Sequence, residues 1–368
     1  MRSFGNPQTT LANMPPRLGA ALSRVDIGKG REELYRDQLP EILRALSAQT
    51  RIESIRASNA IEGIDVSEDR AERLAAASPP RVRDRSEQEF AGYRDAIDEL
   101  MREERLEPPS PTLMLRMHRQ LYAHTLVEGG SLKREDNLIG ERGPDGVVRK
   151  VIFRPPPWQQ TEGLVVGLFD GYNEAVEAEE AHPLVLLAAF IVDLLAIHPV
   201  EDGNGRIARL LTMHELLRRG YGVARYVSVE QRIYESRNGY YAALAQSQRD
   251  WNDATHDVWP WTEYLVAVIA GAYDAFEARV GAARGSAGMG KSERVRHWIL
   301  ESAPGKFKIA DVRKGVPGVS DPTIRNVLHA LRDAGRLRPD GRGRSTAWIR
   351  SEPVLAQAPG TAASDSQR

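Results

Sequence analysis

The sequence predicts a mainly helical protein with one large unit and one small unit. Apolar residues recur at spacings of three and four over most of the first 280 residues, as on the buried faces of helices. The Gly- and Ala-rich stretch GAARGSAGMG at 281–290 has the composition of a flexible linker. A segment with both helix and strand patterns follows at 292–349. Together these observations indicate two independently packed parts.

The large unit is expected to consist of helices separated by proline-marked breaks. Residues 1–30, rich in Pro, Gly and small residues, are expected to be extended. Turn residues followed by β-branched residues predict a short β-hairpin at 139–153. Helical patterns cover 31–61, 81–104, 113–126, 161–178, 182–197, 205–219, 236–248 and 258–280.

In the small unit, helices are expected near 295–300 and 309–314 and from Ser320 to Gly335, followed by a two-stranded wing at 337–349. The last stretch, 351–368, is small and polar and is expected to be disordered. The expected domains are an N-terminal helical region at 1–110, a catalytic domain at 111–280, a linker at 281–291, a C-terminal domain at 292–350 and the tail at 351–368.

Composition narrows the class of protein. The chain has 368 residues, 41% of them hydrophobic and 27% charged, with a formal net charge of -1. This balance gives no global attraction to nucleic acid or to an anionic membrane. The absence of cysteine excludes disulfides, thiolate nucleophiles and zinc–thiolate sites, and suits the reducing cytoplasm, which is the expected location.

No signal peptide is indicated. The apolar run 184–197 is too short to span a bilayer and carries Asp193, so we expect a buried helix and no membrane contact.

The segment with the most chemistry is His198-Pro-Val-Glu-Asp-Gly-Asn-Gly-Arg206-Ile-Ala-Arg209. A glycine-rich turn that leads into a helix presents backbone N–H groups to a phosphate. Arg206 and Arg209, three apart, share a face of that helix. Asp202 is a candidate magnesium ligand and His198 a candidate proton acceptor. An ordinary tight turn would explain Asn204-Gly205, but not the convergence of a base, a carboxylate and two arginines.

This segment resembles the signature of the Fic family, His-Pro-Phe-x-Asp/Glu-Gly-Asn-Gly-Arg-x-x-Arg. It differs only at Val200, which stands in place of the usual Phe. The resemblance continues at 130–140 and 236–244 and covers about 47–280. It implies a Fic-type helical domain with a short β-hairpin flap.

The resemblance implies a protein adenylyltransferase, a nucleotidyltransferase that moves AMP from Mg-ATP to a Ser, Thr or Tyr hydroxyl of a target protein or of the chain itself. His198 would be the general base, Asp202 would bind Mg²⁺, and Tyr241 would lie beside the adenosine. The hairpin at 147–153 would pair with an extended segment of the target. Because family members often self-associate, a homodimer is expected. The residues assigned to the phosphates are Gly203, Asn204, Gly205, Arg206 and Arg209.

Upstream, Ser58-Asn-Ala-Ile-Glu62-Gly63 is by itself a helix C-terminus capped by Gly63. Beside the loop it resembles the family's inhibitory motif, Ser/Thr-x-x-x-Glu-Gly/Asn, in its N-terminal arrangement. The resemblance implies that Glu62 pairs with Arg209 and denies it to the γ-phosphate. In some relatives the equivalent Glu supports removal of AMP. De-AMPylation, or transfer of another phosphate-containing group, therefore stays open.

The residues 285–292 match the P-loop pattern, but a helical pattern precedes them and no parallel sheet follows, so the match is interpreted as chance. The C-terminal domain resembles a winged helix-turn-helix, a common partner of Fic domains. Such a domain binds DNA or protein, and a DNA-binding regulator with a nucleotide-sensing Fic domain is the rival hypothesis. Its basic residues are Arg313, Lys314, Arg325, Arg332, Arg336, Arg338, Arg342 and Arg344.

Overall fold

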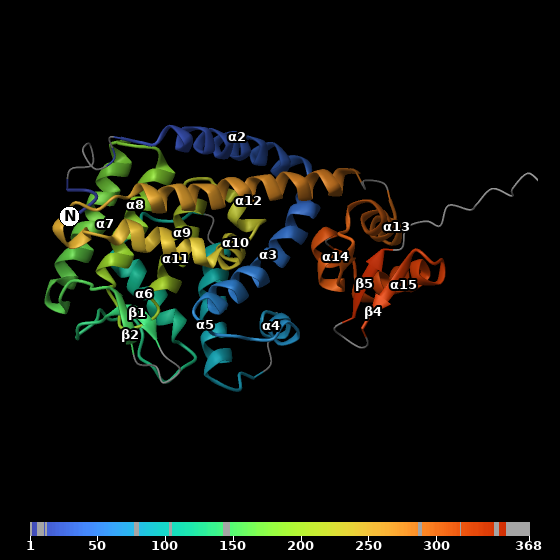
Figure 1. Cartoon of the computed structure of the whole chain (residues 1–368), viewed down its shortest axis with the longest axis horizontal. Coiled ribbons are helices and arrows are strands. Elements are labelled where there is room, and N and C mark those ends of the chain that lie inside the picture. Colours follow the sequence, from blue (N-terminus) through green and yellow to red (C-terminus); the bar gives the residue numbers. More distant parts are fainter. Residues whose placement is uncertain are drawn as a thin grey trace, which may run out of the picture. The chain divides into compact units, whose positions relative to one another are not determined.

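The computed structural model describes residues 2–5, 11, 13–76, 81–102, 105–142, 148–285, 289–316, 318–341 and 346–350. It contains two compact units, 1–278 and 279–368, and each is described by itself (Figure 1). The chain is mainly helical, as predicted. The predicted tail at 351–368 and the centre of the predicted linker, 286–288, lie outside the described residues.

The large unit is built around α8 (Pro183–Ile197), a helix buried along its length from Leu184 to Ile197. Several helices contact it, because its whole surface is apolar apart from Asp193. The other helices of this unit are α2 (Pro16–Gln38), α3 (Pro40–Ile61), α4 (Glu68–Leu74), α5 (Arg85–Arg102), α6 (Pro111–Leu121), α7 (Thr161–Glu177), α9 (Asn204–Arg218), α10 (Val229–Glu235), α11 (Arg237–Gln248) and α12 (Trp259–Gly285), with short 3-10 turns at Trp158–Gln160, Gly222–Arg225 and Trp251–Asp253.

The prediction that residues 1–30 are extended was wrong, because α2 begins at Pro16. The glycines of this helix had been interpreted as a sign of extended chain. Gly28 is needed for close packing, since a Cβ there would collide with the Tyr273 ring of α12. Three ion pairs, beginning with Arg17–Glu263 and ending with Arg31–Glu277, join α2 to α12, and the two helices lie side by side in Figure 1.

Two helix boundaries also differ from expectation. The helical pattern at 31–61 is divided at Pro40, whose ring cannot continue a helix, so α2 ends and α3 begins there. Helix α12 runs beyond the last residue of this unit, Ala278, and continues to Gly285, into the stretch expected to be linker, because Ala282 and Ala283 are good helix formers. Two short helices, α4 and α10, were not predicted.

The predicted hairpin is present as β1 (Ile139–Arg142) paired antiparallel with β2 (Val148–Phe153), and its tip, 143–147, lies outside the described residues.

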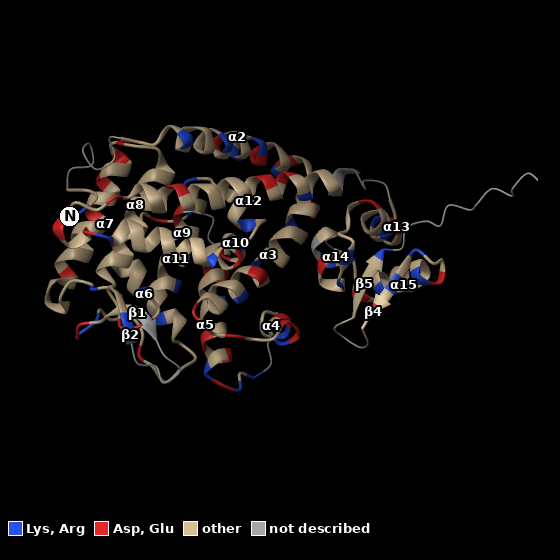
Figure 2. Ribbon diagram, in the orientation of Figure 1, with Lys and Arg blue, Asp and Glu red and all other residues tan. Residues whose placement is uncertain are grey.

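Both signs of charge are interspersed over the helices, without a face of one sign in this view (Figure 2). Among the described residues, no helix has the length and apolarity needed to cross a membrane.

The small unit packs α13 (Lys291–His297), a π-turn at Trp298–Ser302, α14 (Ile309–Gly315) and α15 (Asp321–Asp333) around a core that includes Ile299, Phe307 and Leu328. Its sheet has three strands, in the order β3 (Lys306–Phe307), β5 (Ala347–Arg350), β4 (Leu337–Asp340). The prediction of two strands missed β3, because two residues are too few to produce an alternating pattern. Helix α12, not a strand, precedes the P-loop-like stretch, in agreement with a chance match.

We predict that Asp193→Ala lowers the free energy of unfolding by about 3 kcal/mol, because buried donors lose their acceptor. Asp193 accepts from Ser3 N at 2.9 Å, Ser3 Oγ at 2.8 Å and Trp251 Nε1 at 2.7 Å, and these side chains are buried. Urea unfolding followed by fluorescence measures the change. The matched control is Asp274→Ala, which removes an exposed pair with Arg24 and should cost less than about 1 kcal/mol. Equal losses of unfolding free energy in the two variants would contradict the role of Asp193 as a stabilising buried acceptor.

Candidate functional site

The loop between α8 and α9 is held in one shape by its own backbone and by Asn204. Helix α8 ends at His198, which has left-handed backbone angles, and Gly203 follows with φ 88°. The Asn204 side chain accepts from Val200 N at 3.1 Å and donates to Val200 O at 2.8 Å. Val200, where the family signature has Phe, is fully buried. The turn that leads into α9 is therefore fixed before any ligand binds.

His198 is held in the tautomer that a general base requires. Its Nδ1 lies 3.2 Å from the carbonyl oxygen of Leu195. Since a carbonyl only accepts, Nδ1 carries the proton and Nε2 keeps its lone pair. Burial lowers the pKa of His198 to about 4. The imidazole is therefore neutral at pH 7 and able to take a proton.

Arg209 is buried and is held by the end of α3. Its Nε donates to Ser58 Oγ at 2.8 Å, and its Nη2 donates to Ser58 O at 3.0 Å and to Glu62 Oε1 at 2.7 Å. The pairing of Glu62 with Arg209 expected from the sequence is thus present. Within the described part of the chain, the buried Nη1 of Arg209 has no hydrogen-bond partner.

The Glu62 carboxylate also covers the first turn of α9. A Cβ added to Gly205 would collide with Glu62 Oε1, so this oxygen lies directly against the helix N-terminus. Helix α3 places it there because the chain leaves the helix at Glu62 and turns at Gly63, with φ 78°. A carboxylate at this position is stabilised by the same N–H groups and helix dipole that would stabilise a phosphate.

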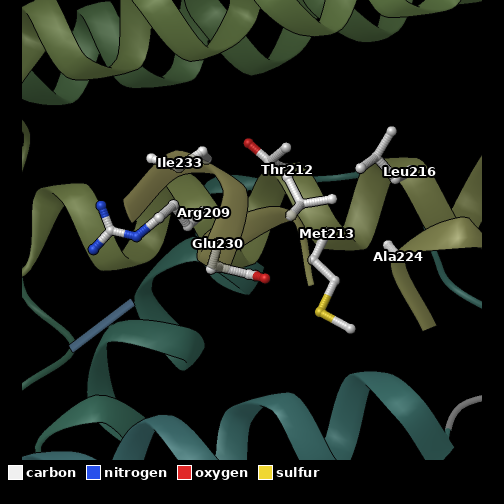
Figure 3. Close-up of a pocket in the computed structure, with 8 residues that line it drawn as sticks. Arg209, Thr212, Met213, Leu216, Ala224, Glu230 and Ile233 are labelled. Carbon is white, nitrogen blue, oxygen red and sulfur yellow. The ribbon is translucent and has the colours of Figure 1, made fainter. Parts of the chain in front are cut away.

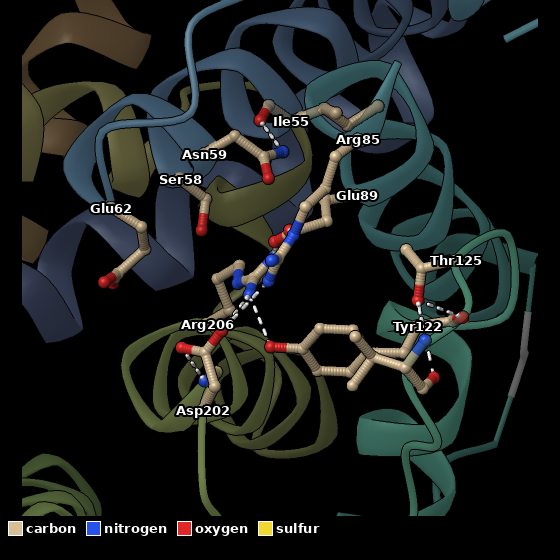
Figure 4. A network of polar contacts seen from close by, with 12 residues as sticks. Ile55, Ser58, Asn59, Glu62, Arg85, Glu89, Tyr122, Thr125, Asp202 and Arg206 are labelled. Atoms are coloured by element: carbon tan, nitrogen blue, oxygen red, sulfur yellow. Dashed lines mark hydrogen bonds and ion pairs between the residues drawn. The ribbon is translucent and has the colours of Figure 1, made fainter. Parts of the chain in front are cut away.

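Arg206 points to a different partner set, on the side of α5 and α6 (Figure 4). Its Nη1 donates to Glu89 Oε2 at 2.6 Å and its Nη2 donates to Tyr122 Oη at 2.8 Å. Arg85 holds the other oxygen of Glu89 at 2.7 Å. Arg206 is only 1% exposed, so its guanidinium group is fixed by the protein itself. Its buried Nε has no hydrogen-bond partner among the described residues.

Asp202 is the exposed carboxylate of the loop. Its side chain is 65% exposed, and one oxygen lies 3.9 Å from both Arg85 and Arg206. In the described ranges, no group of three His, Cys, Asp or Glu side chains could hold a metal ion. Asp202 nevertheless suits Mg²⁺, which commonly takes one or two carboxylates and completes its shell with water and substrate phosphates.

Tyr241 lies at the other edge of the site. It is half exposed, its hydroxyl donates to Ile61 O at 3.2 Å, and its ring packs at 5.1 Å on Tyr240. Behind Arg209 there is a cavity of about 10 Å³, lined also by Met213 and Glu230 (Figure 3). This volume holds one water molecule at most, so the cavity is not a nucleotide pocket.

Several residues that contact the loop were missed by sequence reasoning. They lie 61 to 117 positions from their partners in the chain. Lys133 and Asn137 fall within 130–140, where the sequence resembles the family, but no role was implied for them, and the other three residues belong to no local motif. Each contacts a side chain or a carbonyl of the loop or of the end of α8 through a charged group, a hydroxyl or an amide. These residues are Arg85, Glu89, Tyr122, Lys133 and Asn137.

Three of the predicted basic residues of the small unit lie beside acids. Arg313 bonds Asp321 at 2.8 Å, Arg332 bonds Asp333 at 2.7 Å, and Arg325 lies 3.8 Å from Asp321. Arg342 and Arg344 lie outside the described residues, as does the side chain of Lys314. The described surface therefore offers less positive charge to a phosphate backbone than the residue count suggests.

The sequence of this chain is similar to those of curated proteins. A protein from Culex quinquefasciatus named Protein adenylyltransferase Fic is 32% identical over 109 residues, which are 29% of this chain and 19% of that protein. A protein of the same name from Aedes aegypti is 31% identical over 109 residues, which are again 29% of this chain and 19% of that protein. The chain thus spans about one fifth of the length of these curated relatives.

Solved structures extend the likeness in fold. A Fic family protein from Desulfovibrio desulfuricans G20 superposes with a TM-score of 0.59 and 22% identity, over 92% of this chain and 97% of that chain. Fic-1 from C. elegans superposes with a TM-score of 0.54 and 22% identity, over 74% of this chain and 75% of that chain. Residues 108–216 match the Fic/DOC family, and this stretch includes the loop and most of α9. The chain therefore contains a Fic domain of the Fic/DOC family.

Proposed function

We propose that this chain is an autoinhibited protein adenylyltransferase, which transfers AMP from Mg-ATP to a Ser, Thr or Tyr hydroxyl of a target protein. The observation that carries the proposal is the state of Arg209. This arginine is buried beside the glycine-rich turn; among the described residues its Nη1 has no hydrogen-bond partner, and its Nη2 is held by a carboxylate from a distant helix. The names of the relatives agree with this activity.

The donors at the turn support a triphosphate as the ligand. Arg209 Nη1 and Arg206 Nε are buried and unpartnered in the described part of the chain, and a buried unpaired donor is costly. The N–H groups of Asn204 and Gly205 add the field of a helix N-terminus, whereas the N–H of Gly203 donates to Asp202 Oδ1 at 2.8 Å. Mg²⁺, held by Asp202, would supply further neutralisation of phosphate charge. Phosphoryl chemistry needs this alignment and neutralisation more than covalent help.

His198 completes the reaction. The target oxygen forms a bond to the α-phosphorus of ATP, the bond from that phosphorus to the bridging oxygen breaks, and pyrophosphate leaves. The hydroxyl proton passes to Nε2, the nitrogen left free by the bond from Nδ1 to Leu195 O. Tyr241 would lie beside the adenosine, as the resemblance implies; its half-exposed ring adjoins the end of α3, where its hydroxyl donates to Ile61 O.

Glu62 acts as the brake in this proposal. Its carboxylate accepts from Arg209 Nη2 and lies against Gly205. A phosphate in this place would accept hydrogen bonds from Arg209 and from the N-terminus of α9 instead. Its negative charge also repels the triphosphate. Activation therefore requires Glu62 to leave.

We predict that Glu62→Gly raises incorporation of label from α-labelled ATP by about 10- to 100-fold, the equivalent of one hydrogen bond to a charged group. Adding His198→Ala should then lower the rate by roughly 10²- to 10⁴-fold, the usual contribution of a general base. Label is counted on the chain itself and on proteins of a lysate, with magnesium present.

The matched control for this experiment is Glu68→Gly. Glu68 is a nearby surface glutamate whose partner is Arg56 rather than Arg209, so labelling should stay at the unaltered level. A silent Glu62→Gly, with ATP and with other nucleotides, would sink the transferase assignment. Equal activation by both substitutions would point to general loosening instead of a brake.

We also predict the pH dependence of the released enzyme. Because burial lowers the pKa of His198 to about 4, the base form persists through neutral pH. In Glu62→Gly, kcat/KM for the target should stay level between about pH 6 and 8 and fall only near pH 4 to 5, since this ratio reports the free enzyme. Circular dichroism at each pH monitors folding. An acid limb centred near 6.5, the usual value for His, would contradict the buried neutral imidazole.

A further inference from the structure

The carbonyl groups around His198 are held by a short segment that precedes the hairpin. The last carbonyls of a helix have no partner within it, and a helix that ends inside a protein must find other donors. Here Lys133 Nζ donates to Ile197 O at 3.0 Å and Lys133 N donates to Pro199 O at 2.8 Å. Asn137 Nδ2 lies 3.2 Å from both His198 O and Val200 O. Four consecutive carbonyls thus accept from two residues.

The same segment holds the exit of the hairpin. Lys133 Nζ donates to Pro156 O at 3.1 Å, three residues after β2 ends. Asp136 Oδ1 accepts from Trp158 N at 2.8 Å. The third hydrogen of the Lys133 ammonium goes to Asn137 Oδ1 at 3.0 Å. A single ammonium group therefore joins three parts of the chain: the hairpin exit at Pro156, the segment 133–137 and the end of α8 at Ile197. It uses all three of its donors.

Lys133 is an unusual residue for this position. It is 2% exposed, and among the described residues no carboxylate forms an ion pair with it, which makes its charge costly to bury. Burial lowers the pKa of Lys133 to about 8, so the group is still mainly protonated at pH 7 and keeps three donors. A methionine would fill the space without this cost, but it would leave three acceptors unsatisfied.

We propose that Lys133 is a positioning residue that couples the seat of the β1–β2 hairpin to the position of His198. The inference rests on the proposed function, in which the hairpin binds the target and His198 activates the target hydroxyl. Because Nζ touches Pro156 O and Ile197 O together, displacement of the hairpin exit displaces the peptide before His198. A misplacement of about 1 Å at a reacting group lowers rates by roughly 10²-fold.

The test compares Lys133→Met, which keeps the length of the side chain and removes its donors, with Asn252→Ala. Asn252 Nδ2 donates to Arg154 O at 3.1 Å, so this exposed control also removes a bond to the hairpin exit, but none to the catalytic loop. Hydrogen exchange of 148–158 and 197–205 is measured in the Glu62→Gly chain without nucleotide. Lys133→Met should speed exchange about tenfold or more in both segments, and Asn252→Ala only in 148–158.

Kinetics give the second readout. In the same chain, Lys133→Met should lower kcat for adenylyl transfer roughly 10- to 100-fold with KM for ATP unchanged, whereas Asn252→Ala should stay within about threefold. Lys133→Arg, which retains charge and donors, should recover part of the loss.

Unchanged exchange in 197–205 for Lys133→Met, or equal effects of the two substitutions, would overturn the proposal. If Lys133→Met does not fold, Asn137→Ala decides, because it removes the bonds to His198 O and Val200 O and should speed exchange in 197–205. A Glu62→Gly chain without transferase activity would sink the proposed function, while the exchange data would still judge Lys133.

Discussion

In the proposed function, the site is organised by competition between anions for the N-terminus of α9. This turn offers backbone N–H groups, a helix dipole and buried arginine nitrogens, so it favours whichever anion reaches it. In the structure that anion is the Glu62 carboxylate, which bonds Arg209 and lies against Gly205. The surrounding elements serve this contact. Helix α8 fixes the loop, α3 delivers the glutamate, and α5 and α6 hold Arg206 on the opposite side.

The two arginines of the loop have divided roles because of these neighbours. Arg206 is held by Glu89 and Tyr122, which form part of the folded core, so its position does not depend on the state of the site. Arg209 is held by Ser58 and Glu62 at the end of α3, where the chain turns away at Gly63. Release of one helix end would free Arg209 and leave Arg206 in place. In the proposed function, an inhibitory contact that acts on Arg209 alone can therefore switch the site without unfolding it.

Much of this arrangement could be predicted from the sequence, and the exceptions have physical reasons. The loop His198–Arg209 and the Ser58–Glu62 pair are local patterns, and their resemblance to the family's motifs implied the contact of Glu62 with Arg209, which is present in the structure. Residues that act through tertiary contacts, such as Glu89 and Tyr122, leave no local pattern. Helix α2 was missed because a glycine required for packing against Tyr273 was interpreted as a sign of extended chain. In the small unit, β3 is too short to be predicted from alternation.

The most direct test of the account compares the affinities of ATP and ADP by titration calorimetry, with magnesium, for the unaltered chain and Glu62→Gly. If Glu62 occupies the place of the γ-phosphate beside Arg209, its removal should tighten ATP binding by about tenfold or more and leave ADP binding within about twofold, since only ATP carries that phosphate. Equal tightening for both nucleotides, or none for ATP, would contradict the claim that Glu62 and the γ-phosphate compete for Arg209.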